Sequence, residues 1–289
     1  MIFDEHRNLL FAVAYRILGS AADAEDAVQD AWLKWSSADR SQVADPKAYL
    51  VRIVTNVAMD RLRSAKARRE TYVGPWLPSP ILTDPVPDDS VSMALLVVLE
   101  TLSPLERAVF VLKEAFAFSY AEIAAAVERS EDAVRQAGHR ARAHVQARRP
   151  RFESSRPVQR AVTERFFAAA AGGDINDLME MLAPDVTLWT DGGGKVRQAL
   201  KPVLGASRVA TWLAGVASRP YEGVSPADMI AEIVPVNGSA GVVIRGAGRV
   251  IGTLVLELDD AGRVVTIFNT ANPDKLQAVA ARVVHDPGR

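Results

Sequence analysis

The segment 71–90, "TYVGPWLPSPILTDPVPDDS", contains five prolines in twenty positions. Proline has no backbone N–H and a fixed φ, so this segment cannot be helical, and an extended, semi-rigid linker is expected. The chain must therefore fold in separate parts on either side of it. Because Trp76, Leu77 and Ile81 are apolar, we expect the linker to lie in a groove instead of hanging free in solvent.

The sequence before the linker predicts three helices. Apolar residues recur at helical spacing in the stretches 7–18, 23–35 and 46–63. Asp45 followed by Pro46 marks the start of the third helix, since proline fits the first helical turn. The first 70 residues are therefore expected to be all-α.

Helical signals resume at Met93 and continue to about Arg149. A short helix over 120–127 is followed by a tight turn, and Ser130 is suited to cap a second, basic helix. This order is typical of a helix-turn-helix, whose second helix reads the major groove of DNA. A solvated surface helix is the alternative for the basic segment.

The sequence after Pro157 has a different pattern. Two helices are expected near 158–171 and 175–182, and a third over 207–217. Four stretches of alternating apolar and polar residues follow, divided by glycine-containing turns, which predicts an antiparallel meander. One last helix is expected after Asn272, its cap. Helices followed by such a meander form an α+β domain.

The net charge of −1 conceals strong local differences. The segment 61–69 carries five basic residues and no acid, and the segment 133–151 carries six arginines, two histidines and no acid. Between them, the stretch 71–104 has four acids and neither lysine nor arginine. Two basic helices separated by an acidic linker indicate nucleic-acid binding.

Composition limits the remaining classes of protein. With 289 residues, 49% of them apolar and 24% charged, the chain is expected to form two or three globular domains. It has no cysteine, which excludes disulfides and thiolate chemistry. The N-terminus lacks the apolar core of a signal peptide, and no apolar run approaches the roughly 20 residues of a membrane span. We expect a cytoplasmic protein that needs no membrane, cofactor or metal.

The stretch "TDGGGKV", residues 190–196, superficially resembles a phosphate-binding loop. A P-loop requires a glycine five residues before its Gly-Lys pair and a hydroxyl residue after the lysine. Here Trp189 and Val196 occupy those two positions. The spacing therefore argues against nucleotide binding, and a tight turn between strands is the simpler expectation.

Four stretches together resemble the extracytoplasmic-function (ECF) group of bacterial sigma factors, and the subset of it with a SnoaL-like C-terminal extension. They are "DAEDAVQDAWLKW", "WLPSP", "DGGGKV" and "NPDKL". The resemblance covers nearly the entire chain. It implies a region 2 domain over 1–70, a linker over 71–92, a region 4 helix-turn-helix domain over 93–150 and a SnoaL-like domain over 156–289.

The resemblance implies a factor that directs promoter-specific transcription initiation, with core RNA polymerase and promoter DNA as partners. It places contacts with the clamp helices of the largest polymerase subunit on Asp26, Gln29, Asp30, Trp32 and Trp35. Burial in the core is the alternative for the tryptophans, since Val28, Trp32 and Trp35 share an apolar stripe. It places the −10 promoter element on Arg52, Asn56, Asp60, Arg61 and Arg63, and the −35 element on Arg135, Gln136, His139, Arg140 and Arg142.

In this family the linker threads basic channels of the polymerase, which would involve Asp84, Asp88 and Asp89 here; a solvated spacer is the alternative. The extra domain is expected to be a built-in regulator, linked to the sigma part by a tether. The residues expected at that regulatory interface are Trp76, Leu77, Asp191, Gly192, Gly193, Gly194, Lys195, Asp274 and Lys275. An isolated hairpin turn is the alternative for the glycines.

A rival hypothesis concerns the C-terminal domain alone. SnoaL-like cones are related to ketosteroid isomerase, and some relatives are cyclases with a carboxylate base in an apolar cavity. Asp185 and Asp191 would be candidate acids, and the cavity would be lined by Trp189, Trp212, Tyr221 and Phe268. No paired acid and base stands out, so we expect no enzyme; sensing of an unknown small molecule without turnover is the other alternative.

Overall fold

The computed structural model describes residues 2–39, 41, 43–83, 91–148 and 155–283. The chain forms two compact units, which we describe separately. The helical unit comprises Met1–Thr71 and Leu95–Arg149, and the C-terminal unit comprises Tyr72–Ala94 and Pro150–Arg289. Among the described residues, no helix is long and apolar enough to cross a membrane.

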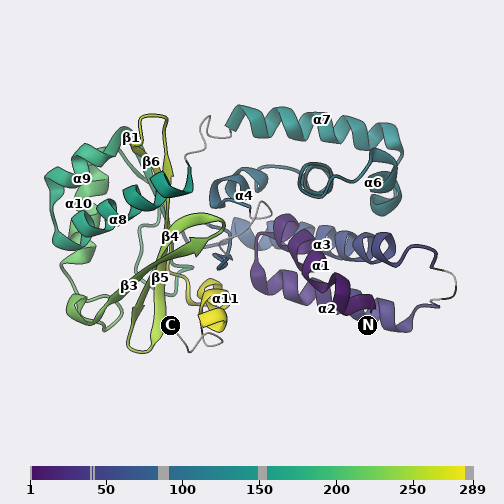
Figure 1. Cartoon of the computed structure of the whole chain (residues 1–289), viewed down its shortest axis with the longest axis horizontal. Helices are drawn as coiled ribbons and strands as arrows, with labels where there is room; N and C mark the ends of the chain where they lie inside the picture. Colours follow the sequence, from purple (N-terminus) through teal and green to yellow (C-terminus); the bar gives the residue numbers. More distant parts are fainter. Residues whose placement is uncertain (1, 40, 42, 84–90, 149–154, 284–289) are drawn as a thin grey trace. The chain divides into compact units, whose positions relative to one another are not determined.

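The helical unit is all-α in its described part, as predicted (Figure 1). The helices that contribute to it are α1 (Ile2–Leu18), α2 (Ala21–Ser37), α3 (Pro46–Glu70), α4 (Met93–Leu99), α5 (Pro104–Phe110) with the π-helical turn η2 (Val111–Ala115), α6 (Tyr120–Val127) and α7 (Glu131–Arg148).

Local capping explains where several of these helices begin. The Asp45 carboxylate accepts a hydrogen bond from the Ala48 N–H at 3.0 Å, and Pro46 occupies the first position of α3. Glu128 ends α6 with a φ of +55°, and the Ser130 hydroxyl then accepts from the Ala133 N–H at 3.3 Å. The predicted start of α3 and the predicted helix-turn-helix of α6 and α7 are both confirmed.

The C-terminal unit is α+β and contains a six-stranded sheet. Its helices are α8 (Arg156–Gly172), α9 (Ile175–Met181), α10 (Ala206–Ala217), the short 3-10 helix η3 (Pro226–Asp228) and α11 (Pro273–Val283). Its strands are β1 (Leu182–Asp191), β2 (Val203–Leu204), β3 (Ile230–Val236), β4 (Ser239–Gly246), β5 (Arg249–Leu258) and β6 (Val264–Thr270).

The sheet order is β2-β1-β6-β5-β4-β3. The four strands from β3 to β6 form the predicted antiparallel meander, whereas β1 pairs with β6 in parallel. Helices α8, α9 and α10 pack on one face of the sheet, where Phe166, Leu178, Val209 and Ile267 belong to one apolar core (Figure 1). Helix α11 packs against β5.

The linker residues 72–83 belong to the C-terminal unit. Leu77 is 1% exposed, and Leu82 forms a β-bridge with Val236 at the end of β3. The backbone continues this pairing, since the Thr83 N–H donates to the Pro235 carbonyl at 3.1 Å. The predicted groove-bound linker is confirmed for this stretch. Asp84, Asp88 and Asp89 lie outside the described residues.

Candidate functional site

A buried carboxylate at the end of β1 binds the linker. Asp191 is fully buried, and it accepts hydrogen bonds from the Tyr72 hydroxyl at 2.6 Å and the Leu77 N–H at 2.8 Å. Lys275, from α11, pairs with the same carboxylate at 2.6 Å. The backbone carbonyl of Asp191 also accepts from the N–H groups of Ala271 and Asn272. One residue thus joins the "WLPSP", "DGGGKV" and "NPDKL" stretches.

Lys275 holds the linker by several kinds of contact. Its ammonium group donates to the Leu77 carbonyl as well as to Asp191. It lies 4.1 Å from the ring centroid of Trp76 and 4.9 Å from that of Tyr72. A desolvated cation over an aromatic face is attracted by the ring quadrupole, so Lys275 contacts both side chains and backbone of the linker.

Tyr72 completes this cluster. Its hydroxyl donates to Asp191 and accepts from the Asn272 side-chain amide at 2.8 Å. Burial raises the pKa of Tyr72, and the hydrogen bond to the Asp191 carboxylate raises that pKa further, because both favour the neutral phenol. The hydroxyl therefore stays protonated and serves as a hydrogen-bond donor.

The glycines allow the linker to approach the backbone of the 192–194 turn. Gly193 and Gly194 have φ values of +60° and +70°, which residues with a Cβ rarely adopt. A Cβ on Gly193 would overlap the Asn272 amide and lie 3.1 Å from the Tyr72 hydroxyl. A Cβ on Gly194 would lie 3.0 Å from the Cβ of Val73. We name Tyr72, Leu77, Asp191, Gly193, Asn272 and Lys275 the linker clasp.

The remaining members of the predicted regulatory set lie around the clasp. Lys195 pairs with Asp274 at 2.6 Å, and both side chains are more than half exposed. A Cβ on Gly192 would lie 2.6 Å from the Val196 carbonyl.

Tyr72 and Asn272 were not predicted as clasp residues. Tyr72 stands outside the recognised "WLPSP" stretch, and Asn272, which does cap α11 through Asp274, gave no sign of its second hydrogen bond.

In the helical unit, α6 occupies part of the face predicted to read the −10 element. The Asn56 amide donates to the Ala126 carbonyl at 3.0 Å, and Arg52 pairs with Glu128 at 3.0 Å. Asp60, four residues after Asn56, is exposed and pairs with Arg63. Asn56 and Asp60 therefore have separate partners in this conformation.

The predicted polymerase-binding residues of α2 divide into an exposed and a buried set. Asp26, Gln29 and Trp32 are exposed, and Asp30 is half-buried. Trp35 is 4% exposed and packs on the ring of Tyr49, so it is a core residue here. The apolar stripe that suggested burial of both tryptophans holds for Trp35 alone. Arg61, predicted to contact the −10 element, pairs with Asp30 at 2.6 Å and with Asp26 at 3.2 Å.

Helix α7 presents the residues predicted for the −35 element. Arg135, Gln136, His139 and Arg140 are exposed, and Arg142 is half-buried. Three of these arginines have carboxylate partners: Arg135 pairs with Glu131, Arg140 with Glu106 at 2.8 Å and Arg142 with Glu114 at 2.6 Å. Exposed pairs of this kind contribute roughly 0–1 kcal/mol, so DNA phosphates can replace the carboxylates at little cost.

A buried ion cluster, not predicted from the sequence, lies beneath these surfaces. Glu100 accepts from Arg69 of α3 and from Arg107 of α5. Arg107 is 1% exposed, and its Nε donates to the Arg16 carbonyl at the end of α1. Burial lowers the pKa of Arg107 to about 9. The cluster joins α1 and α3 to α5, and nothing in residue spacing signals such long-range partners.

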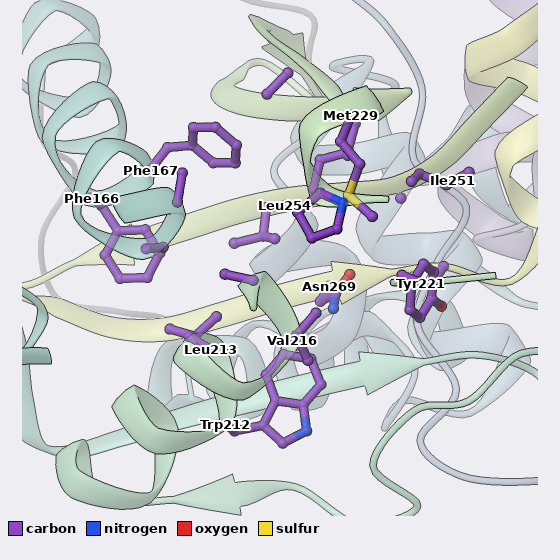
Figure 2. Close-up of a pocket in the computed structure, with 18 of the residues that line it drawn as sticks. Phe166, Phe167, Trp212, Leu213, Val216, Tyr221, Met229, Ile251, Leu254 and Asn269 are labelled. Carbon is purple, nitrogen blue, oxygen red and sulfur yellow. The ribbon is translucent and has the colours of Figure 1, made fainter. Parts of the chain in front are cut away.

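The C-terminal unit also contains a cavity of about 380 Å³, beneath α8 and α10 (Figure 2). Trp212 and Tyr221 line it, as predicted, whereas Trp189 and Phe268 do not. The candidate acids are elsewhere: Asp185 is exposed, and Asp191 is in the clasp. The described lining residues include no acid, histidine or lysine, so the arrangement expected of a carboxylate-based cyclase is not found there.

Comparisons with known proteins agree with this division of the chain. Residues 2–68 match the family Sigma-70 region 2, and residues 92–145 match Sigma-70, region 4. The ECF RNA polymerase sigma factor SigJ of Mycobacterium tuberculosis is 39% identical over 94% of this chain and 91% of its own. The probable ECF sigma factor SigI of the same species is 31% identical, over 96% and 94% respectively.

The fold is shared as well as the sequence. The crystal structure of Mycobacterium tuberculosis SigJ superimposes with a TM-score of 0.75 and 34% identity, covering 96% of this chain and 97% of that one. The similarity thus extends through the α+β extension. The chain belongs to the ECF sigma factors of RNA polymerase and carries a SnoaL-like C-terminal domain.

Proposed function

We propose that this sigma factor recognises promoters through α3 and α7, binds the core polymerase clamp helices through α2, and is regulated by its own C-terminal domain through the linker clasp. The functional divisions are 1–70 for region 2, 71–92 for the linker, 93–150 for region 4 and 156–289 for the regulator. The factor acts in the cytoplasm, where polymerase and promoters are found.

The observation that carries the regulatory part is the burial of the linker by a different part of the chain. Leu77 and Asp191 are almost fully buried and hydrogen-bond each other across 114 residues of sequence. The linker connects the two promoter-reading regions, so fixing it to the C-terminal domain limits where those regions can move. Release of the linker would change how the factor engages polymerase and DNA.

The α3–α6 contact supports a conformational step during initiation. In the described conformation, Arg52 and Asn56 bind residues of α6 instead of a nucleic acid. A phosphate can replace the exposed Glu128 at Arg52, but a −10 base can bind the half-buried Asn56 amide only after that amide leaves the Ala126 carbonyl of α6. We expect polymerase binding to provide that separation.

In vitro transcription with purified core polymerase tests the proposal. Gly193→Val adds a side chain where Asn272 and Tyr72 now lie, so it should release the linker and change transcript yield several-fold. Gly262→Val is the matched control, because it is another positive-φ glycine whose Cβ would meet open space. Linker release can be verified by limited proteolysis within 72–83. Released linker with unchanged transcription would refute regulation by the clasp.

Promoter reading is tested separately. Asn56→Ala should lower open-complex formation while leaving binding to −35 duplex intact, and Arg140→Ala should do the reverse. If Arg140→Ala impaired only pre-melted templates, the assignment of the two helices would be wrong. Failure of the full-length and truncated chains to bind core polymerase would contradict polymerase recruitment itself.

A further inference from the structure

The cavity of the C-terminal unit has the size of a small-molecule site. Its volume of about 380 Å³ lies within the range of roughly 300–1,000 Å³ that is usual for such pockets. Helices α8 and α10 form one side, and strands β4, β5 and β6 contribute the other. Figure 2 shows Phe166 and Phe167 on one side of the cavity and Tyr221 on the opposite side.

The cavity walls favour an apolar occupant with rings. The apolar side chains that line it include Phe166, Phe167, Trp212, Leu213, Met229 and Leu254. No charged side chain occurs among the described lining residues. An ionised ligand would lose its hydration there without gaining a partner, which is costly. An uncharged ligand is therefore favoured.

Two amide side chains in this apolar lining have hydrogen-bonding groups that no described residue satisfies. Asn269 is 8% exposed, and its side chain has no partner there. The Gln198 amide donates to the Tyr221 hydroxyl at 2.9 Å, but its Oε1 is buried and unsatisfied within the described part of the chain. Buried polar groups in proteins normally form hydrogen bonds, and a buried group without one costs about 1–3 kcal/mol of stability. Figure 2 shows Asn269 among the lining side chains.

We propose that the cavity binds an uncharged, mainly apolar ring molecule that carries a hydroxyl group. The ring system packs against the aromatic and aliphatic walls. The hydroxyl hydrogen-bonds to the Asn269 amide, which offers both a donor and an acceptor, and rotation of the Gln198 amide toward the cavity would bring its buried Oε1 into reach as a second acceptor. Asn269 and Gln198 are thus specificity-determining residues of a ligand site distinct from the sigma surfaces.

The same two residues connect the cavity to the linker clasp, and this step rests on the proposed regulatory function. Asn269 and Ala271 line the cavity on the segment that ends at Asn272, and the Ala271 N–H donates to the Asp191 carbonyl at 2.8 Å. Gln198 packs beneath Gly192, where a Cβ would lie 2.9 Å from its Cγ. A ligand that orders Asn269 and Gln198 therefore acts on the immediate neighbours of Asp191 and should change how firmly the linker is held.

Ligand-observed NMR on the full chain tests the site with three probes that share one ring system. The probes are 1-naphthol, naphthalene, which lacks the hydroxyl, and 1-naphthoate, which is anionic. We expect 1-naphthol to bind about three- to tenfold more tightly than naphthalene, the amount that one hydrogen bond provides. Asn269→Leu should remove that preference while retaining naphthalene binding.

Gly252→Leu is a second variant, which tests the space of the cavity beside Asn269, since a Cβ on Gly252 would lie 3.9 Å from the Asn269 Oδ1. Gly252 lines the cavity, and a Cβ there would lie 3.7 Å from its nearest neighbour, which is an ordinary van der Waals contact. The backbone therefore tolerates the Cβ of leucine, and the rest of the leucine side chain occupies the cavity. It should abolish binding of 1-naphthol and naphthalene without lowering the melting temperature of the chain. Equal binding of these two probes to the wild type, or retained binding in Gly252→Leu, would overturn the site. Tighter binding of 1-naphthoate would overturn the uncharged class and would point to Arg197 and Arg219, which line a neighbouring pocket that shares Gln198 and Trp212 with the cavity.

Hydrogen exchange over residues 72–83 tests the coupling. Saturating 1-naphthol should change amide protection there in the wild type but not in Gly252→Leu. Binding without any change in protection would overturn the coupling and leave the ligand site standing. Regulation by the linker is judged by Gly193→Val, which requires no ligand, so the two failures are distinguishable.

Discussion

Two ion pairs join the 191–195 turn to the start of α11. Because one pair is buried and the other is exposed, we expect them to contribute very differently to the free energy of unfolding. Asp191 and Lys275 are 0% and 9% exposed in their side chains, whereas Lys195 and Asp274 are 53% and 57% exposed. Removing one partner of a buried pair leaves a desolvated charge, which typically costs about 3–5 kcal/mol. An exposed pair contributes roughly 0–1 kcal/mol.

We therefore expect Asp191→Asn to lower the free energy of unfolding of the C-terminal unit by about 3–5 kcal/mol, and Lys195→Ala by less than about 1 kcal/mol. Chemical denaturation of the full-length variants measures both values. Losses of similar size would show that Asp191 is not the residue on which the clasp depends.

The carboxyl group of Glu257 on β5 predicts that the free energy of unfolding depends on pH. Burial raises the pKa of its carboxyl group from 4.5 to about 7, although Thr266 partly opposes the shift. A raised folded-state pKa gives stability that is complete below pH 4.5 and is lost as pH rises through 7. The wild type should lose up to about 3 kcal/mol across that window, and Glu257→Gln should not. Unfolding free energies from pH 4.5 to 8 provide the measurement, with exposed Glu180→Gln as control; parallel curves for wild type and Glu257→Gln would contradict the prediction.

Helices α3 and α6 suggest a direct test of conformational opening, which the absence of cysteine from the chain simplifies. Ala48 on α3 and Ala125 on α6 line a common pocket of the helical unit, and neither side chain is fully buried. Cysteines at these two positions can be joined by a short cross-linker that contains a cleavable disulfide. Joining them keeps α6 against the face that carries Asn56.

The cross-linked chain should bind core polymerase but fail to open promoters, and reduction should restore transcription. Each single-cysteine variant, treated in the same way, controls for modification alone. Full activity of the cross-linked chain would mean that α3 can read a −10 strand without leaving α6.

Sequence reasoning succeeded where the determining contacts are local. Asp45 with Pro46 marked the start of α3, and Ser130 marked the start of α7, because caps act within a single turn. It failed where partners are distant in sequence. The parallel pairing of β1 with β6, the burial of Trp35, and the hydrogen bonds of Tyr72 each depend on segments that periodicity does not relate.

Deleting residues 156–289 tests the relation between the chain's parts. The linker would then lose Asp191, Asn272 and Lys275 together, and apolar Leu77 would be left without its cover. We expect the truncated factor to retain polymerase binding, to be cleaved rapidly within 72–83, and to differ strongly from the full chain in transcript yield. An unchanged yield would refute the C-terminal domain as regulator.

The clasp also has a consequence for biosynthesis. Tyr72 and Asn272 are 200 residues apart, so the ribosome must make nearly the entire chain before they can meet. At about 5–20 residues per second, this interval lasts roughly 10–40 s. Both promoter-reading regions emerge earlier, because α7 ends at Arg148. Every newly made molecule thus passes through a period in which its sigma regions can fold while its linker is still unbound, and translation speed sets the length of that period.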